Sequence, residues 1–149
     1  MAPVLVLAID TSTPQITVGV VEVLSPHEVI AALETAIAAD APAPDPDRLL
    51  AERVVIDAYG HAEKLLPLVT ATLGDAGKAL PDLAAIVVGV GPGPFTGLRV
   101  GMATAAALGD ARDIPVHPVP SHDALAAAAH FDGPLLVATD ARRKEVYAS

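Results

Sequence analysis

The sequence predicts a layered α/β protein, and three observations support this fold class. Its 149 residues are 52% hydrophobic but only 3% aromatic, so the expected core consists of Val, Leu, Ile and Ala. Short runs rich in β-branched residues alternate with segments of helical spacing. The apolar run from Leu83 to Val88 is followed by a glycine-rich loop and then by good helix formers, which indicates a strand, a loop and a helix in succession.

The first half of the chain predicts a hairpin, an inserted helix and a third strand. The strands are the apolar or β-branched runs at 4–9, 15–23 and 49–56. The first run ends at Asp10, and the polar turn 11–14 follows it. Ser25-Pro26 is a start signal for a helix over 27–39, and the proline-rich stretch 41–47 is expected to be an exposed linker. Residues 25–47 therefore form an excursion between two strands of one sheet, in which no chemical motif is present.

The second half predicts helices on either side of the central strand and a repeat of the opening strand. Helices are predicted at 60–74, 96–109 and 121–130, and a further strand is predicted at 114–119. The apolar run Leu135–Asp140 aligns with Leu5–Asp10, and each ends in aspartate. Because residues 145–149 would supply a second strand, the pattern suggests a duplicated unit of which the opening strands are present.

Composition and charge restrict the classes of function. The chain has no cysteine, so it can hold no disulfide framework or thiolate metal site. A net charge of −9 argues against this chain wrapping nucleic acid by itself, because phosphate binding depends on Lys and Arg. The one dense basic run, Arg142-Arg143-Lys144, is more often a solvated face than a site. The N-terminus lacks the basic region of a signal peptide and no apolar run approaches a membrane span, so a cytoplasmic protein is expected.

The glycine-rich loop at 89–101 does not fit the familiar phosphate-binding patterns. Glycine loops before helices often hold phosphate through backbone N–H groups. However, the loop has no Gly-Lys pair, and the dinucleotide spacing counted from Gly89 or Gly91 meets Pro94 or Thr96. Pro92 and Pro94 also lack the N–H that a phosphate would require.

Small residues recur every fourth position in the following helix, at Gly97, Gly101, Ala105 and Gly109. They line one face, and each glycine costs about 1 kcal/mol relative to alanine, so something is expected to approach this face closely. We infer that another helix lies there. From the residues alone, this neighbour belongs either to the same fold or to a partner subunit.

Three other polar features could be catalytic or metal-binding, but each also has a simpler structural explanation. Asp10 could position a metal-bound nucleotide, or it could cap the turn by accepting backbone N–H bonds. His61 lacks a second histidine at the ligand spacing, because Leu65 occupies that place. Ser121, His122 and Asp123 are the three residue types of a hydrolase triad. They cannot form one here, because consecutive side chains on a helix point about 100° apart. A serine N-cap and an acidic first turn explain these three residues without catalysis.

Four stretches of the sequence together resemble the TsaB (YeaZ) family, the bacterial partner in tRNA threonylcarbamoyladenosine synthesis. They are Asp10-Thr-Ser-Thr, His61-Ala-Glu-Lys-Leu-Leu-Pro, residues 91–101 and Asp140-Ala-Arg-Arg-Lys-Glu-Val-Tyr. The resemblance covers nearly all of the chain and implies an actin-like fold of the sugar-kinase and Hsp70 type. Residues 1–133 would form a first lobe with a mixed five-stranded sheet flanked by helices, in the strand order 3-2-1-4-5. Residues 134–149 would be the opening strands of a truncated second lobe. The excursion at 25–47 is longer than the family leads us to expect.

The resemblance implies a non-catalytic scaffold that supports TsaD. TsaD would bind ATP and metal, TsaE would join the pair, and tRNA would be contacted only indirectly. Family members pair through the two helices that start here near His61 and Thr96, with TsaD or with themselves as a dimer, which favours a partner subunit at the small-residue face. The residues expected at this interface are His61, Leu65, Leu68, Val69, Thr96, Gly97, Arg99, Gly101 and Ala105.

No catalytic residue, metal ligand or membrane contact is expected in this chain, and two enzyme functions are the alternatives to a scaffold. In an actin-like ATPase or kinase, Asp10 would place a metal and the turn Thr11–Thr13 would hold phosphate, so Asp10, Thr11 and Ser12 are the candidate cofactor residues. A glycoprotein peptidase, suggested by older naming of the family, has no metal pair or triad in the sequence to support it.

Overall fold

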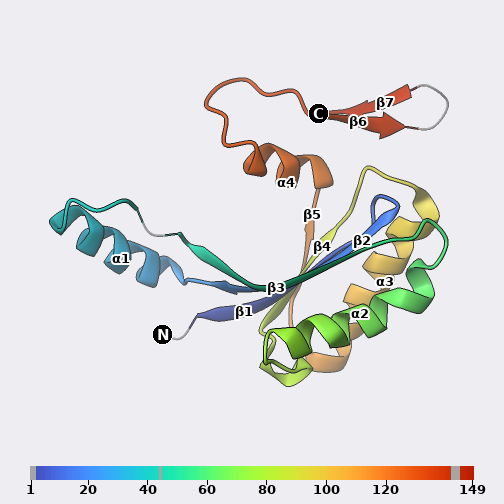
Figure 1. The fold of residues 1–149 in the computed structure, drawn as a ribbon, viewed down its shortest axis with the longest axis horizontal. Coiled ribbons are helices and arrows are strands. Elements are labelled where there is room, and N and C mark those ends of the chain that lie inside the picture. Colours follow the sequence, from blue (N-terminus) through green and yellow to red (C-terminus); the bar gives the residue numbers. More distant parts are fainter. Residues whose placement is uncertain (1–2, 44, 142–144) are drawn as a thin grey trace.

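The computed structural model describes residues 3–43, 45–141 and 145–149, and its main feature is a five-stranded mixed sheet (Figure 1). The strands are β1 (Val4–Asp10), β2 (Gln15–Val23), β3 (Asp47–Ile56), β4 (Ala85–Gly89) and β5 (Val116–Val119). Their order is β3-β2-β1-β4-β5. β1, β2 and β3 pair antiparallel, whereas β4 and β5 continue the sheet in parallel. The predicted strand order is confirmed.

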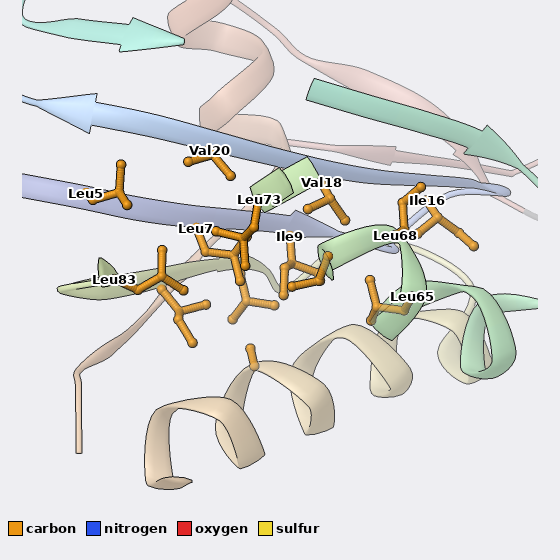
Figure 2. Close-up of a cluster of buried hydrophobic side chains, with 14 residues drawn as sticks. Leu5, Leu7, Ile9, Ile16, Val18, Val20, Leu65, Leu68, Leu73 and Leu83 are labelled. Carbon is orange, nitrogen blue, oxygen red and sulfur yellow. The ribbon is translucent and has the colours of Figure 1, made fainter. Parts of the chain in front are cut away.

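Two helices, α2 (His61–Asp75) and α3 (Phe95–Arg112), cover one face of this sheet (Figure 1). Alternate residues of β1 and β2 point into that layer, because successive side chains of a strand face opposite ways. Figure 2 shows the resulting core, whose labelled members are Leu5, Leu7, Ile9, Ile16, Val18, Val20, Leu65, Leu68, Leu73 and Leu83. Each such side chain contributes about 1.5–3 kcal/mol when fully buried. The site described below is built on this layer.

The excursion between β2 and β3 contains helix α1 (Pro26–Ala38), as predicted. A capping box fixes its start: Glu28 N–H donates to Ser25 Oγ at 3.3 Å, and Ser25 N–H donates to a Glu28 carboxylate oxygen at 2.7 Å. The two ends of the excursion meet where Leu24 N–H donates to the Pro46 carbonyl at 2.9 Å. In Figure 1 the helix extends away from the sheet.

The end of the chain forms a separate antiparallel hairpin, β6 (Ala138–Ala141) and β7 (Glu145–Ala148), next to helix α4 (Ser121–Ala128). The strand predicted to begin at Leu135 begins instead at Ala138. His122 of α4 is buried, and its ring nitrogens lie 2.8 Å from Thr139 Oγ1 and 2.8 Å from Ser149 Oγ. His122 therefore links α4 to the hairpin. The basic run Arg142-Arg143-Lys144 lies outside the described residues.

Within the described ranges, no helix combines the length and the apolar character that crossing a bilayer requires.

Candidate functional site

The turn that follows β1, residues 10–13, is the centre of the polar chemistry in this fold. Asp10 Oδ1 accepts hydrogen bonds from Ser12 N–H at 2.8 Å and from Ser12 Oγ at 2.6 Å. Its other oxygen, Oδ2, lies 3.2 Å from Ser121 Oγ, which is also 3.0 Å from Ser12 Oγ. The Asp10 carboxylate is thus engaged by its own chain, and the alternative in which it caps the turn is confirmed.

Thr11 connects this turn to α3. Its hydroxyl donates to the Gly97 carbonyl at 2.8 Å and accepts from Gly101 N–H at 3.1 Å. In a regular helix these two backbone groups, one turn apart, bond to each other. The buried hydroxyl bonds to both groups, so the Thr11 side chain lies directly against the helix backbone.

The glycines of the loop and helix leave the space that the turn occupies. A Cβ on Gly101 would overlap Thr11 Oγ1, and a Cβ on Gly97 would lie 3.0 Å from the Thr11 carbonyl oxygen. A Cβ on Gly93 would overlap the Ser12 carbonyl, and a Cβ on Gly89 would overlap the Asp10 carboxylate. The glycine-rich motif therefore packs around the Asp10 turn, where side chains would not fit.

This packing corrects the expectation for the small-residue face of α3. Gly97, Gly101, Ala105 and Gly109 are all buried inside their own lobe, and a Cβ on Gly109 would overlap Val116 of β5. The face is therefore sealed by a polar turn and a strand of the same chain, and the prediction that these residues contact a partner subunit is wrong. Spacing of four indicated a close approach but could not identify the approaching group.

The other residues expected at a partner interface are partly buried in the core and partly exposed. His61 is buried, and its Nε2 lies 3.1 Å from the Thr13 carbonyl, so it holds the far end of the Asp10 turn. Leu65, Leu68 and Val69 belong to the core. Of the residues named for this interface, only Thr96 and Arg99 are exposed, and the Arg99 guanidinium stacks 5.0 Å from the centre of the Phe95 ring.

The outward sides of α2 and α3 carry a different set of residues, which the sequence reasoning missed. A shallow hollow of about 390 Å³ lies between the two helices. It is lined by Ala62, Leu66, Ala103, Thr104, Ala107 and Leu108. Leu66 is 51% exposed there, and Met102 is also exposed on α3. Helical spacing could have located this face as the complement of the buried residues on each helix.

A smaller hollow of about 150 Å³ lies beside Asp10 and Ser121, between the ends of β1, β4 and β5 and the helix α4. Its walls are mainly apolar, with Ala8, Val87 and Val119 among them. The other two candidate cofactor residues, Thr11 and Ser12, are buried and engaged in the bonds described above. In the part of the chain that the structure describes, no cluster of three His, Asp or Glu side chains is placed to hold a metal ion.

Ser121 of α4 differs from its predicted role as N-cap, and His122, for which no role was predicted, makes a long-range contact. The residue before the helix is Pro120, so Ser121 is not the N-cap and its hydroxyl reaches Asp10 and Ser12 instead. His122 points to the hairpin β6–β7. No local sequence signal indicates either contact, because each joins segments that are distant in the chain.

The chain matches a family model and a solved crystal structure. The family model described as "TsaD: tRNA N6-adenosine threonylcarbamoyltransferase" matches residues 55–149. A crystal structure from Pseudomonas aeruginosa, described as an uncharacterized protein with similarity to peptidase YEAZ, aligns with a TM-score of 0.72 and 31% identity. The alignment covers 97% of this chain and 57% of that one.

Sequence relatives agree with the structural match. An uncharacterized protein of Mycobacterium tuberculosis is 49% identical over 142 residues, which is 95% of this chain and 56% of that protein. The tRNA threonylcarbamoyladenosine biosynthesis protein TsaB of Bacillus subtilis is 40% identical over 102 residues, which is 68% of this chain and 44% of that protein. The chain spans about half the length of the curated relatives that it matches.

Proposed function

Because the chain belongs to the TsaB (YeaZ) family and has its actin-like fold, we propose that it acts in the formation of threonylcarbamoyladenosine in tRNA. Its proposed role is that of a non-catalytic subunit that docks a TsaD-type transferase and supports threonylcarbamoyl transfer to adenosine. ATP and metal would be bound by the TsaD partner, a TsaE-type protein would join the pair, and tRNA would be contacted through the partner.

The engaged Asp10 turn is the observation that carries the non-catalytic role. An actin-like enzyme needs a free carboxylate to place a metal ion and free N–H groups to hold phosphate. Here both Asp10 oxygens and Ser12 N–H have partners within the chain. The loop backbone at Gly93 also packs on the Ser12 carbonyl. A phosphate group bound by Ser12 N–H, or a metal ion bound by the Asp10 carboxylate, would have to compete with these hydrogen bonds.

The outward hollow between α2 and α3 is the surface that we propose for docking. It is apolar, it lies on two neighbouring helices, and its inner side is fixed by the core and by the Asp10 turn. A helix pair of the partner would complete a bundle there, with ridges of its side chains filling the hollow. A second copy of this chain could pair through the same helices and would then compete with the transferase.

The docking proposal is tested with one substitution in the hollow and one matched control. Leu66→Asp places a carboxylate in the hollow, whereas Leu125→Asp changes a leucine of α4 that is similarly exposed, at 49% against 51%. We expect Leu66→Asp to weaken the complex with the cognate TsaD on a sizing column and to lower threonylcarbamoyladenosine in tRNA, measured by nucleoside mass spectrometry. Leu125→Asp should change neither. Unaltered complex formation by Leu66→Asp would overturn the docking surface, and equal tRNA modification without this chain would overturn the supporting role.

The enzyme alternative makes a different prediction for the isolated chain. An ATPase or kinase that uses Asp10 would hydrolyse ATP alone, and Asp10→Ala would abolish the activity. Under the proposed role, the purified chain has no ATP hydrolysis for Asp10→Ala to remove, because the carboxylate serves to hold the turn. Hydrolysis that follows Asp10 would replace the proposal with the enzyme alternative.

A further inference from the structure

Helix α1 carries an apolar stripe that neither the core nor the proposed function uses. Val29, Ile30, Leu33 and Ile37 recur at helical spacing and share a stripe about 100° wide. None of the helix residues is buried by the rest of the described chain, and Ile30 and Ile37 are 57% and 78% exposed. Contiguous exposed apolar patches of this kind mark sites of interaction.

Local contacts fix the start of the helix, which suits a docking element. Pro26 in its first turn and the Ser25–Glu28 capping box favour its start. A helix of 13 residues is marginally stable in water without packing. A partner laid along the stripe would therefore stabilise α1 in addition to covering it.

The charge of the excursion indicates what kind of partner fits. Residues 25–47 contain five acidic residues and no Lys or Arg: Glu28, Glu34, Asp40, Asp45 and Asp47. Glu34 is exposed and lies four residues after Ile30 and three before Ile37, so it borders the stripe on the helix surface. An occupant must therefore offer apolar side chains together with positive charge.

We propose that the stripe of α1 docks a basic amphipathic helix of a partner protein. This helix would present apolar residues at i, i+3, i+4 and i+7 with Lys or Arg beside them, the usual pattern of a helix in an apolar groove. The stripe from Val29 to Ile37 is about 12 Å long, so two to three turns of the partner suffice. A second copy of α1 would bring like charges together, and phosphates of RNA or of anionic lipid would be repelled by the same carboxylates.

Two synthetic helical peptides test this proposal. Both are about 18 residues long, so that each can form a helix, and both carry the same leucine stripe. One has Lys at its polar positions and the other has Glu. Fluorescence anisotropy with the full chain should show binding of the Leu/Lys peptide, weakened by salt, and no binding of the Leu/Glu peptide.

Substitutions locate the binding and separate it from non-specific attraction to an acidic protein. Ile30→Ser and, independently, Ile37→Ser should each weaken binding of the Leu/Lys peptide by about tenfold or more. Leu125→Ser on α4 is the matched control at an exposed leucine, and this variant should bind the Leu/Lys peptide as the unmodified chain does. Glu34→Lys should weaken the Leu/Lys peptide and strengthen the Leu/Glu peptide. Circular dichroism of each variant checks that its helix content is retained.

The negative outcomes are equally specific. Absence of Leu/Lys binding, or binding that neither stripe variant weakens, would overturn the docking surface. Equal binding of the two peptides would overturn the requirement for positive charge. Self-association that Ile37→Ser abolishes would identify a second copy as the occupant and would also overturn the proposal. None of these readouts involves TsaD, so they are independent of the proposed function.

Discussion

Gly101→Ala provides the sharpest test of how the Asp10 turn is built into the fold. The new Cβ would overlap Thr11 Oγ1 and would lie 3.3 Å from Thr11 Cβ. Thr11 is buried and cannot turn away without losing its bonds to Gly97 O and Gly101 N–H. One added methyl group in a full site costs about 1–3 kcal/mol, and each lost hydrogen bond costs about 1 kcal/mol.

Alanine is also a better helix former than glycine by about 1 kcal/mol, which offsets part of this cost. We therefore expect Gly101→Ala to lower the free energy of unfolding by about 2–4 kcal/mol and Tm by roughly 4–16 °C for a domain of this size. The assay is urea denaturation followed by circular dichroism, with Tm from a thermal scan.

Gly74→Ala is the matched control, because Gly74 also lies in a helix but nothing stands within 4 Å of its added Cβ. This variant should gain about 0.5–1 kcal/mol in the free energy of unfolding from helix propensity. The double variant Thr11→Ala, Gly101→Ala should lose less stability than the sum of its single changes, because the overlap is removed. If Gly101→Ala is as stable as Gly74→Ala, the close packing of α3 on the turn is refuted.

Two further outcomes are expected from contacts outside the turn. His122→Phe should keep the bulk of the ring but lose its bonds to the β6–β7 hairpin, so amide exchange in the hairpin should accelerate while the five-stranded sheet remains protected. The pKa of Asp57 is lowered by Lys64 and then by the N–H groups of Tyr59 and Gly60. Its contribution to stability is therefore present above the ordinary aspartate pKa of about 3.9 and is lost as the pH falls below it. Asp57→Asn should flatten this part of the stability profile, measured by urea denaturation at a series of pH values.

Local signals explain why so much of the architecture could be predicted. The strand from Gln15 to Val23 is rich in β-branched residues and is bounded by a polar turn and by Ser25-Pro26, so its limits were predicted correctly. The order of the strands came from the resemblance to a known family, and the structure confirms it. The assignment of residues 1–133 and 134–149 to two lobes remains a prediction.

The contacts around the turn could not be read from the sequence in the same way. Thr11 and its partners Gly97 and Gly101 are separated by 86 and 90 positions. Small residues at a period of four report only that the helix backbone is approached closely. A neighbouring helix and a polar turn would both require small residues at every fourth position. In the structure, the Asp10 turn packs against this face of α3. The error in the expected interface followed from this ambiguity.

The corrected position of the small-residue face changes how any docking experiment must be interpreted. A substitution at Gly97 or Gly101 acts on the fold through Thr11, so it would weaken a complex by reducing the folded fraction. A substitution at Leu66 acts on the outward surface, where side-chain changes usually leave stability within about 0.5 kcal/mol. Complex formation must therefore be measured at temperatures where both variants remain folded. Under that condition, Leu66→Asp should lose the partner and Gly101→Ala should retain it, whereas a partner seated on the small-residue face would require the reverse.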